Sequence, residues 1–286
     1  MLITKSTKII YRNEVGGEIE FSPFSAYFVE NIEEETKNNI TTNKTNLIHG
    51  ENYISNTLES RYISLSGLID KNSTTKALIR NLTKVVNPTL KGKLIYQNEN
   101  EVKEIEVIPE QIPDINANGG LIRYEVSLMA CNPFWKNTEK TEYLALFMPM
   151  LTFPLVIEQE EGMVFSLKDS VLETEFNNQG DVESGVRVLF KARGGTVQNP
   201  KIMNDLTGEF IKLNYSMEKG DSIEVISYPE KKKVTVNSTI NGFRYLDIES
   251  NFFNLLVGKN KLSYIADENT INLDVIVYYT PRFLGV

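Results

Sequence analysis

The chain has 286 residues, of which 41% are hydrophobic and 24% charged, an ordinary composition for a globular protein with a sizeable core. It contains a single histidine, His49, and a single cysteine, Cys131, which excludes an intramolecular disulfide and a zinc site built from several Cys and His ligands. The formal net charge is −8, and no cluster of Lys and Arg is large enough for free binding to a DNA backbone, although an acidic wall would let DNA slide past without sticking.

The residue types of the chain give little support for an enzyme. A Ser-His-Asp triad would need His49, and a Cys-His dyad would need to pair His49 with Cys131, but nothing local supports either arrangement. Cys131 follows an alternating strand, so we expect a small buried thiol at a strand end; His49 stands beside Gly50 and reads as a turn residue. No glycine pair precedes a Lys-Ser/Thr and a helix, so the sequence predicts no phosphate loop, and no catalytic or cofactor-binding residues are assigned.

The first half reads as short strands with one helix. Strands are expected at residues 3–11, 26–32, 63–69 and 121–130, and a hairpin at residues 93–108. Asn72 or Ser73 can cap a helix that Asn87-Pro88 ends. The apolar face of this helix at 3.6-residue spacing is made of Leu78, Ile79, Leu82, Val85 and Val86.

A polar stretch, residues 33–46, interrupts this pattern. It is rich in Asn and Thr and contains little apolar material. Two interpretations stay open, a mobile loop and a projecting arm that reaches a partner.

The second half predicts a β-sandwich, because many short strands alternate with Gly-containing turns and no convincing helix appears. The apolar run at residues 143–157 is too short to span a bilayer and is interrupted by Pro149 and Pro154, so no membrane segment is expected. We therefore expect a first domain at 1–135, a linker at 136–152 and a second domain at 153–286.

One segment matches the sequence pattern of a metal-binding loop. Asp114, Asn116, Asn118 and Glu125 fit the calcium-loop pattern, with Gly119 at the sharp turn. The context contradicts an EF-hand, since prolines precede the loop and a strand-like alternation follows it. The alternative is an Asn-Gly-Gly turn that joins two strands, and the expected assignment is no metal and no cofactor.

Several strings resemble the siphophage distal tail proteins. The match runs in order along nearly the whole chain, with one departure at Val225-Ile226-Ser227, and its sharpest string closes the first domain. The strings are residues 61–69, Asn87-Pro88 with Gly92, Leu94 and Tyr96, Cys131-Asn132-Pro133-Phe134-Trp135, and then residues 178–181, 200–209, 220–225 and 258–260.

The resemblance implies a mainly β fold: an N-terminal β-sandwich-like ring domain with one α-helix, and a C-terminal galectin-like or carbohydrate-module-like β-sandwich. It implies a structural virion protein of the phage tail tip, made in the bacterial host cytoplasm. Its members form a hexameric ring around the DNA passage, between the tail tube protein and the tail hub protein, and the C-terminal domains can contact receptor-binding parts. DNA would pass without specific binding, and residues 33–46 could form an arm that reaches a neighbour.

Two rival functions remain. A carbohydrate-binding protein could act through the second domain, whose aromatic side chains can stack on sugars, although most aromatics of a sandwich belong to its core. A cell-wall hydrolase would need an acid/base carboxylate pair, and a sequence cannot show the separation of two carboxylates.

Overall fold

The computed structural model describes residues 6–45, 49–71, 74–99, 101–137, 139–149, 166–169 and 173–286. The chain forms two compact units. Unit 1 comprises Met1–Asn137 together with Phe283–Val286, and unit 2 comprises Thr138–Arg282. Each unit has a hydrophobic core of its own, and each is described below by itself.

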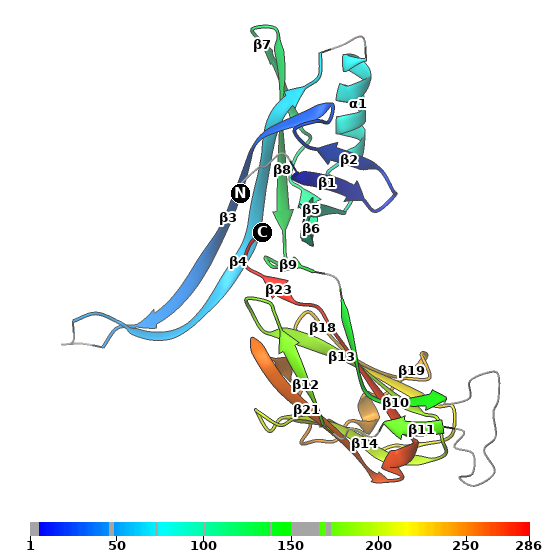
Figure 1. Cartoon of the computed structure of the whole chain (residues 1–286). Helices are drawn as coiled ribbons and strands as arrows, with labels where there is room; N and C mark the ends of the chain where they lie inside the picture. Colours follow the sequence, from blue (N-terminus) through cyan, green and yellow to red (C-terminus); the bar gives the residue numbers. More distant parts are fainter. Residues whose placement is uncertain are drawn as a thin grey trace, which may run out of the picture. The chain divides into compact units, whose positions relative to one another are not determined.

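Unit 1 is built on one large sheet with a single helix beside it (Figure 1). The sheet has ten strands in the order β23-β9-β6-β5-β1-β2-β3-β4-β8-β7, and a further pairing of β6 with β8 closes it on itself. Its strands are β1 (Lys8–Asn13), β2 (Glu18–Phe21), β3 (Tyr27–Asn43), β4 (Asn52–Ile69), β5 (Gly92–Gln97), β6 (Val102–Pro109), β7 (Asp114–Asn118), β8 (Leu121–Ala130), β9 (Trp135–Lys136) and β23 (Arg282–Phe283).

Alternation of apolar and polar residues explains the core of unit 1. In β8, Tyr124, Val126, Leu128 and Ala130 are buried, while the residues between them face outward. Helix α1 (Thr75–Val85) adds Leu82 and Val85 to the same core. The predicted hairpin at residues 93–108 is present as β5 and β6.

Unit 2 is a sandwich of two sheets around one core. An eight-stranded sheet runs in the order β11-β10-β22-β13-β17-β18-β19, with β20 attached to β13, and a five-stranded sheet runs β12-β21-β14-β15, with β16 attached to β14. Its elements are β10 (Lys140–Pro149), β11 (Ser166–Asp169), β12 (Glu173–Asn178), β13 (Ser184–Ala192), β14 (Val197–Asn204), β15 (Phe210–Lys212), β16 (Ser216–Met217), β17 (Ser222–Tyr228), β18 (Lys231–Val236), β19 (Ile240–Asn241), β20 (Asn254–Leu255), β21 (Gly258–Glu268), β22 (Leu273–Tyr279) and the short 3₁₀ helices η1 (Phe243–Tyr245) and η2 (Thr270–Asn272).

The predicted fold class is confirmed: the chain is mainly β, with one α-helix in its first half and a β-sandwich in its second. In the described part of the chain, no helix is long and apolar enough to cross a membrane.

The structure differs from the sequence-based boundaries in two places. The expected linker at 136–152 contains β10, which pairs with β22 inside unit 2, and the last four residues return to unit 1. The apolar run could not indicate this, because a strand and an extended linker have the same local pattern. Asn72 and Ser73 lie outside the described residues. Thr74 is the residue before α1, and its side chain makes no cap hydrogen bond.

Candidate functional sites: an arm on unit 1 and a polar network on unit 2

The most prominent feature of unit 1 is the β3–β4 hairpin, whose outer part we call the arm (residues 37–59). The two strands stay paired from Tyr27↔Ile69 to Asn43↔Asn52, whereas β8 accompanies β4 only as far as Arg61 (Figure 1). Every described residue of the arm is exposed except the half-buried Leu58. The polar stretch at residues 33–46 is therefore mostly strand, and the loop alternative is wrong for its described part up to Asn43.

The arm carries apolar side chains that its own unit does not cover. Ile40, Tyr53 and Ile54 are 57%, 63% and 58% exposed. Tyr53 pairs with Thr42, which lies two residues from Ile40 on the same strand, so Ile40 and Tyr53 share one face. Such exposed apolar side chains on a projecting hairpin are typical of a contact surface.

The root of the arm holds a buried ionic group, the Arg61 cluster. The guanidinium of Arg61 donates through Nη1 to Glu34 Oε2 at 2.6 Å, through Nε to the carbonyl oxygen of Pro133 at 2.7 Å, and through Nη2 to the carbonyl oxygen of Leu284. Trp135 Nε1 donates to the same Glu34 oxygen at 3.0 Å. A guanidinium is suited to this place because its donors are fixed in one plane and can satisfy several acceptors at once.

A hollow of about 640 Å³ lies in the outer face of β3, β4 and β8. Five glutamates line it: Glu33, Glu34, Glu35, Glu110 and Glu125. Glu34 is paired with Arg61, and Glu35 lies 3.5 Å from Lys37. Among the described residues, Glu33, Glu110 and Glu125 have no ion-pair partner, so this face is strongly acidic.

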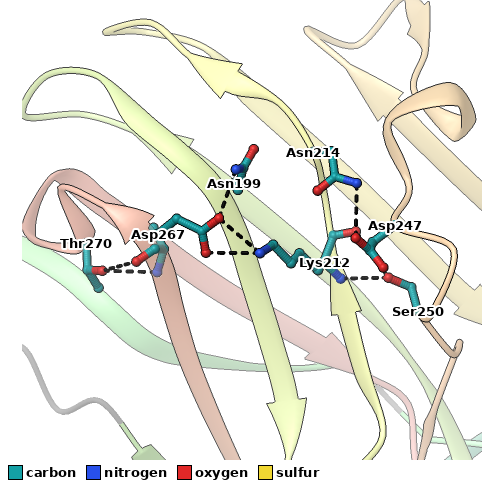
Figure 2. A network of polar contacts seen from close by, with 8 residues as sticks. Asn199, Lys212, Asn214, Asp247, Ser250, Asp267 and Thr270 are labelled. Carbon is teal, nitrogen blue, oxygen red and sulfur yellow. Dashed lines mark hydrogen bonds and ion pairs between the residues drawn. The ribbon is translucent and has the colours of Figure 1, made fainter.

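On unit 2, a network of polar side chains spans the outer side of the five-stranded sheet (Figure 2). Lys212 Nζ lies 3.0 Å from both carboxylate oxygens of Asp267, which also accepts from Asn199 Nδ2 at 2.9 Å. Asn214 Nδ2 donates to Asp247 at 3.0 Å, and the Ser250 hydroxyl exchanges hydrogen bonds with the backbone of Lys212. The network joins β14, β15, β21 and the segment around Asp247.

Both carboxylates of the network are held in the ionised form. The pKa of Asp267 is lowered from its usual range, chiefly by the hydrogen bonds from Asn199 and Lys212. The pKa of Asp247 is lowered by the backbone N–H of Glu249 and by the Asn214 amide. Their stabilising effect is therefore present at neutral pH and is lost in acid, as the pH falls through the lowered pKa values.

The calcium-pattern residues lie on the β7–β8 hairpin. Asp114 stands directly opposite Glu125, Asn116 donates to the Asp114 carboxylate at 3.1 Å, and Gly119 and Gly120 form the turn with positive φ. Extended strands point alternate side chains to one flat face and do not wrap them around a cation. Within the described residues, no group of three or more His, Cys, Asp or Glu is placed to hold a metal ion.

The prediction of a buried Cys131 thiol is wrong. It follows β8 at the strand end, as expected, but its side chain is exposed and not buried. The alternation of β8 places Ala130 inside, so the next residue points outward. His49 is exposed in a bend beside Gly50 and has no role in either site.

The Arg61 cluster was not predicted from the sequence. Arg61 and Trp135 both belong to strings that carried the resemblance, but their convergence on Glu34 joins positions 27 and 101 residues apart. Only the pairing of β3 with β4 and the return of the chain to unit 1 bring these groups together.

Two family models match the chain in order. The phage tail protein RIFT-related domain matches residues 16–125, and the siphovirus-type tail component, C-terminal domain, matches residues 179–283. A search of curated proteins finds no significant match.

Solved structures extend the comparison to the whole fold. The crystal structure of the SPP1 Dit protein (gp 19.1), described as a paradigm of the hub adsorption apparatus in phages that infect Gram-positive bacteria, superposes with a TM-score of 0.69 at 11% identity, over 96% of this chain and 99% of that chain. A chain of the phage P2 baseplate in its activated conformation with Ca gives a TM-score of 0.48 at 12% identity, over 98% of this chain and 99% of that chain, a similarity too low to support an argument.

The two matched tail domains account for most of the chain, and the SPP1 Dit protein shares the fold of both units. The resemblance found in the sequence is thereby confirmed, and the chain belongs to the siphophage distal tail (Dit) proteins, structural components of the virion tail.

Proposed function

We propose that this distal tail protein forms a hexameric ring at the tail tip that joins the tail tube protein to the tail hub protein around the DNA channel. Unit 1 builds the ring, and unit 2 serves the periphery, where receptor-binding parts attach. The role is assembly and mechanical coupling, without catalysis. The observation that carries the proposal is the arm: a long paired hairpin whose exposed apolar side chains have no cover within the described part of unit 1.

A contact made by the arm would be heterologous, because the arm and the body that receives it are different surfaces of the same chain. Head-to-tail contacts of this kind generate closed rings when the rotation between neighbours closes. Ile40 and Tyr53 supply apolar anchors. No strand in the described part of the chain pairs with the outer edges of β3 and β4 beyond the body, so these edges can pair with a strand of a neighbour.

The acidic hollow supports a position of this face of unit 1 beside the DNA channel. Glu33, Glu110 and Glu125, which form no ion pair within the described residues, present negative charge that repels a phosphate backbone and disfavours its adsorption. A channel that DNA must cross without delay requires a wall of this sign, in agreement with the net charge of −8.

The test shortens the arm. Deleting residues 39–57 and joining Asn38 to Leu58 through an Asn-Gly turn keeps a paired end and leaves the Arg61 cluster intact. We expect a folded monomer in place of rings, measured by light scattering on a sizing column, because the surface that bridges neighbours is gone. The control Thr57→Ala keeps the arm at full length and should keep the rings.

Rings of unchanged mass from the shortened chain would refute the bridging role of the arm. A full-length chain that stays monomeric both alone and when co-produced with its neighbouring tail proteins would refute the ring itself. Zero turnover of purified peptidoglycan is expected for the full-length protein, and any turnover would contradict a role without catalysis.

A second candidate function, carbohydrate binding through unit 2, is favoured by one observation. The network of Asn199, Lys212 and Asp267 is exposed yet held in fixed positions by charge-assisted hydrogen bonds (Figure 2), and preorganised carboxylate and amide groups suit recognition of sugar hydroxyls. Binding of the full chain on a glycan array, lost in Asp267→Ala, would support this function; an array without signal would end it.

A further inference from the structure

Two positively charged side chains occupy core-facing strand positions in unit 1. Lys103 has the same parity on β6 as the buried Ile105, and Arg61 has the same parity on β4 as the buried Ile63. Lysine and arginine are almost never buried to this extent, 7% and 5% exposed, unless acceptors surround their charged ends. Some of these acceptors come from the last four residues of the chain, Phe283–Val286, which we call the terminal segment.

The terminal segment meets the two cations mainly through its backbone. The carbonyl oxygen of Gly285 accepts from Lys103 Nζ at 3.1 Å, and the carbonyl oxygen of Leu284 accepts from Arg61 Nη2. The ring of Phe283 lies with its centroid 4.3 Å from the same Lys103 ammonium, a cation–π contact. One aromatic ring and two consecutive carbonyls are thus recognised by two inward-facing donors.

The terminal segment also completes the sheet and the core of unit 1. Phe283 and Val286 pack against the buried core of this unit. β23, which ends at Phe283, borders β9 at the edge of the sheet. β9 is only Trp135–Lys136, and in the described part of the chain it pairs with β6 at the single position Glu104↔Lys136. Its other neighbour is β23, so the placement of β9 depends on the terminal segment.

Both groups that touch the terminal segment continue to the root of the arm. Trp135 Nε1 donates to Glu34 on β3, and the same carboxylate oxygen accepts from Arg61. Arg61 pairs with Thr36 at the last position where β8 still accompanies β4. The inner end of the arm is therefore held by side chains whose own positions depend on Leu284 and β23.

We propose that Arg61, Lys103 and β9 form a peptide-binding site on unit 1, whose ligand is the C-terminus of the same chain. Its occupation completes unit 1 and fixes the root of the arm. The ligand class is an extended segment with an aromatic side chain followed by two backbone carbonyls, which adds a strand to a sheet edge.

The position of the ligand at the end of the chain has a consequence for assembly. Residues 138–282 are synthesised before the terminal segment, which takes roughly 7–30 s at 5–20 residues per second. A truncated or unfinished chain therefore has an arm whose root is not fixed. The site itself is a property of a single chain; that its occupation controls ring assembly rests on the proposed function.

The test vacates the site in the full chain. Replacing residues 283–286 by Gly-Ser-Gly-Ser preserves the peptide bond after Arg282, which keeps its contacts with Val182 and Glu183 on unit 2. Amide hydrogen exchange at residues 34–36, 61–63 and 135–136 should become about tenfold faster, while β13 of unit 2 keeps its rates. The calorimetric transition of unit 1 should fall by about 5 °C and that of unit 2 should stay within about 1 °C.

Two single substitutions separate recognition from general fraying of the terminus. Phe283→Ala removes the ring beside Lys103 and should accelerate exchange in the same segments, by less than the full replacement. Leu284→Ala is the matched control, because its side chain is 48% exposed and its carbonyl, the group that Arg61 contacts, is kept. It should leave all rates at the parental values. If the replaced chain fails to fold, these two variants decide the outcome.

Parental exchange rates and an unshifted unit 1 transition in the replaced chain would overturn the proposal. So would equal acceleration by Phe283→Ala and Leu284→Ala, or an equal acceleration in β13, since the effect would then not be specific to the site. Parental rates that depend on protein concentration would assign the bound segment to a second copy and overturn its assignment to the same chain.

The mass of the replaced chain in solution separates this proposal from the ring-forming role. Monomers with a rapidly exchanging arm root would support both. Rings of parental mass, formed while residues 34–36 and 61–63 still exchange rapidly, would support the site and contradict the bridging role of the arm.

Discussion

Tyr11 lies wholly inside unit 1, yet no described protein group is within hydrogen-bond distance of its hydroxyl oxygen. Its ring packs on Gly92, where an added Cβ would come within 2.7 Å of the Tyr11 ring. Burial, together with the nearby Glu14, raises the pKa of Tyr11 from 10.0 to about 12. The ring of Tyr11 therefore contributes packing, whereas burial of its hydroxyl group lowers the stability of the fold.

We expect Tyr11→Phe to leave stability unchanged or to raise it by up to about 1 kcal/mol, because the variant removes a buried hydroxyl without a partner. A folded pKa above the unfolded one stabilises fully below pH 10.0, and this stabilisation is lost as the pH rises through about 12. The variant should therefore lose stability less steeply than the parent across this range. Urea unfolding at neutral pH and near pH 11 measures both effects, and parallel losses would contradict the assignment.

The Arg61 cluster shows a different use of a buried polar group. Nε, Nη1 and Nη2 of the guanidinium each donate to an acceptor, and the acceptors come from the segment before β9, from β3 and from the last residues of the chain, Phe283–Val286. A buried charge is tolerated when it is paired and fully hydrogen-bonded, and it then specifies one arrangement of the chain more than it adds stability. Arg61 thus fixes how several segments meet.

At the scale of elements, the β3–β4 hairpin depends on a close backbone approach at Gly67. A Cβ added there would lie 1.9 Å from the carbonyl oxygen of Phe28 and 2.9 Å from Tyr124 Oη. The Tyr124 hydroxyl donates to that same carbonyl at 3.3 Å, so the site is closed from both sides. Only glycine allows β4 to pass between β3 and the Tyr124 side chain.

Gly67→Ala should destabilise unit 1 by about 1–3 kcal/mol, because the backbone of β3 must move to admit a methyl group. Ser66→Ala, its neighbour on β4, is the matched control and should stay within about 0.5 kcal/mol of the parent. Denaturant unfolding followed by the fluorescence of Trp135 reports on unit 1. Equal stability of the two variants would show that the backbone of β3 moves to admit the methyl group without loss of free energy of unfolding.

At the scale of the whole molecule, two separate cores predict two unfolding events. Leu65 is fully buried in the core of unit 1, and Phe190 is fully buried in that of unit 2. Leu65→Ala and Phe190→Ala should each cost about 2–5 kcal/mol. Each variant should lower only the calorimetric transition of its own unit, since distant sites act independently. Transitions that shift together in both variants would mean that the units unfold as one.

Local sequence patterns were enough to predict which segments form strands and which forms the helix. Strict alternation in residues 121–130 and helical spacing from Leu78 to Val86 are local patterns, and β8 and α1 follow them. Composition also excludes an intramolecular disulfide and a zinc site built from several Cys and His ligands, since one cysteine and one histidine cannot supply them. The ordered strings carried the family resemblance that the matched tail domains confirmed.

The roles of those elements depend on contacts between segments far apart in the sequence. The composition of residues 33–46, polar and rich in Asn and Thr, is compatible with a loop and with an arm, and the pairing with β4 distinguishes the two. The residues expected as a linker became β10 because β22 offered a partner, and Cys131 is exposed because the alternation that buries Ala130 turns the next residue outward. Arg61 meets Leu284 across 223 positions, and no local periodicity predicts a contact at that separation, because it forms only when the last residues of the chain pack on unit 1.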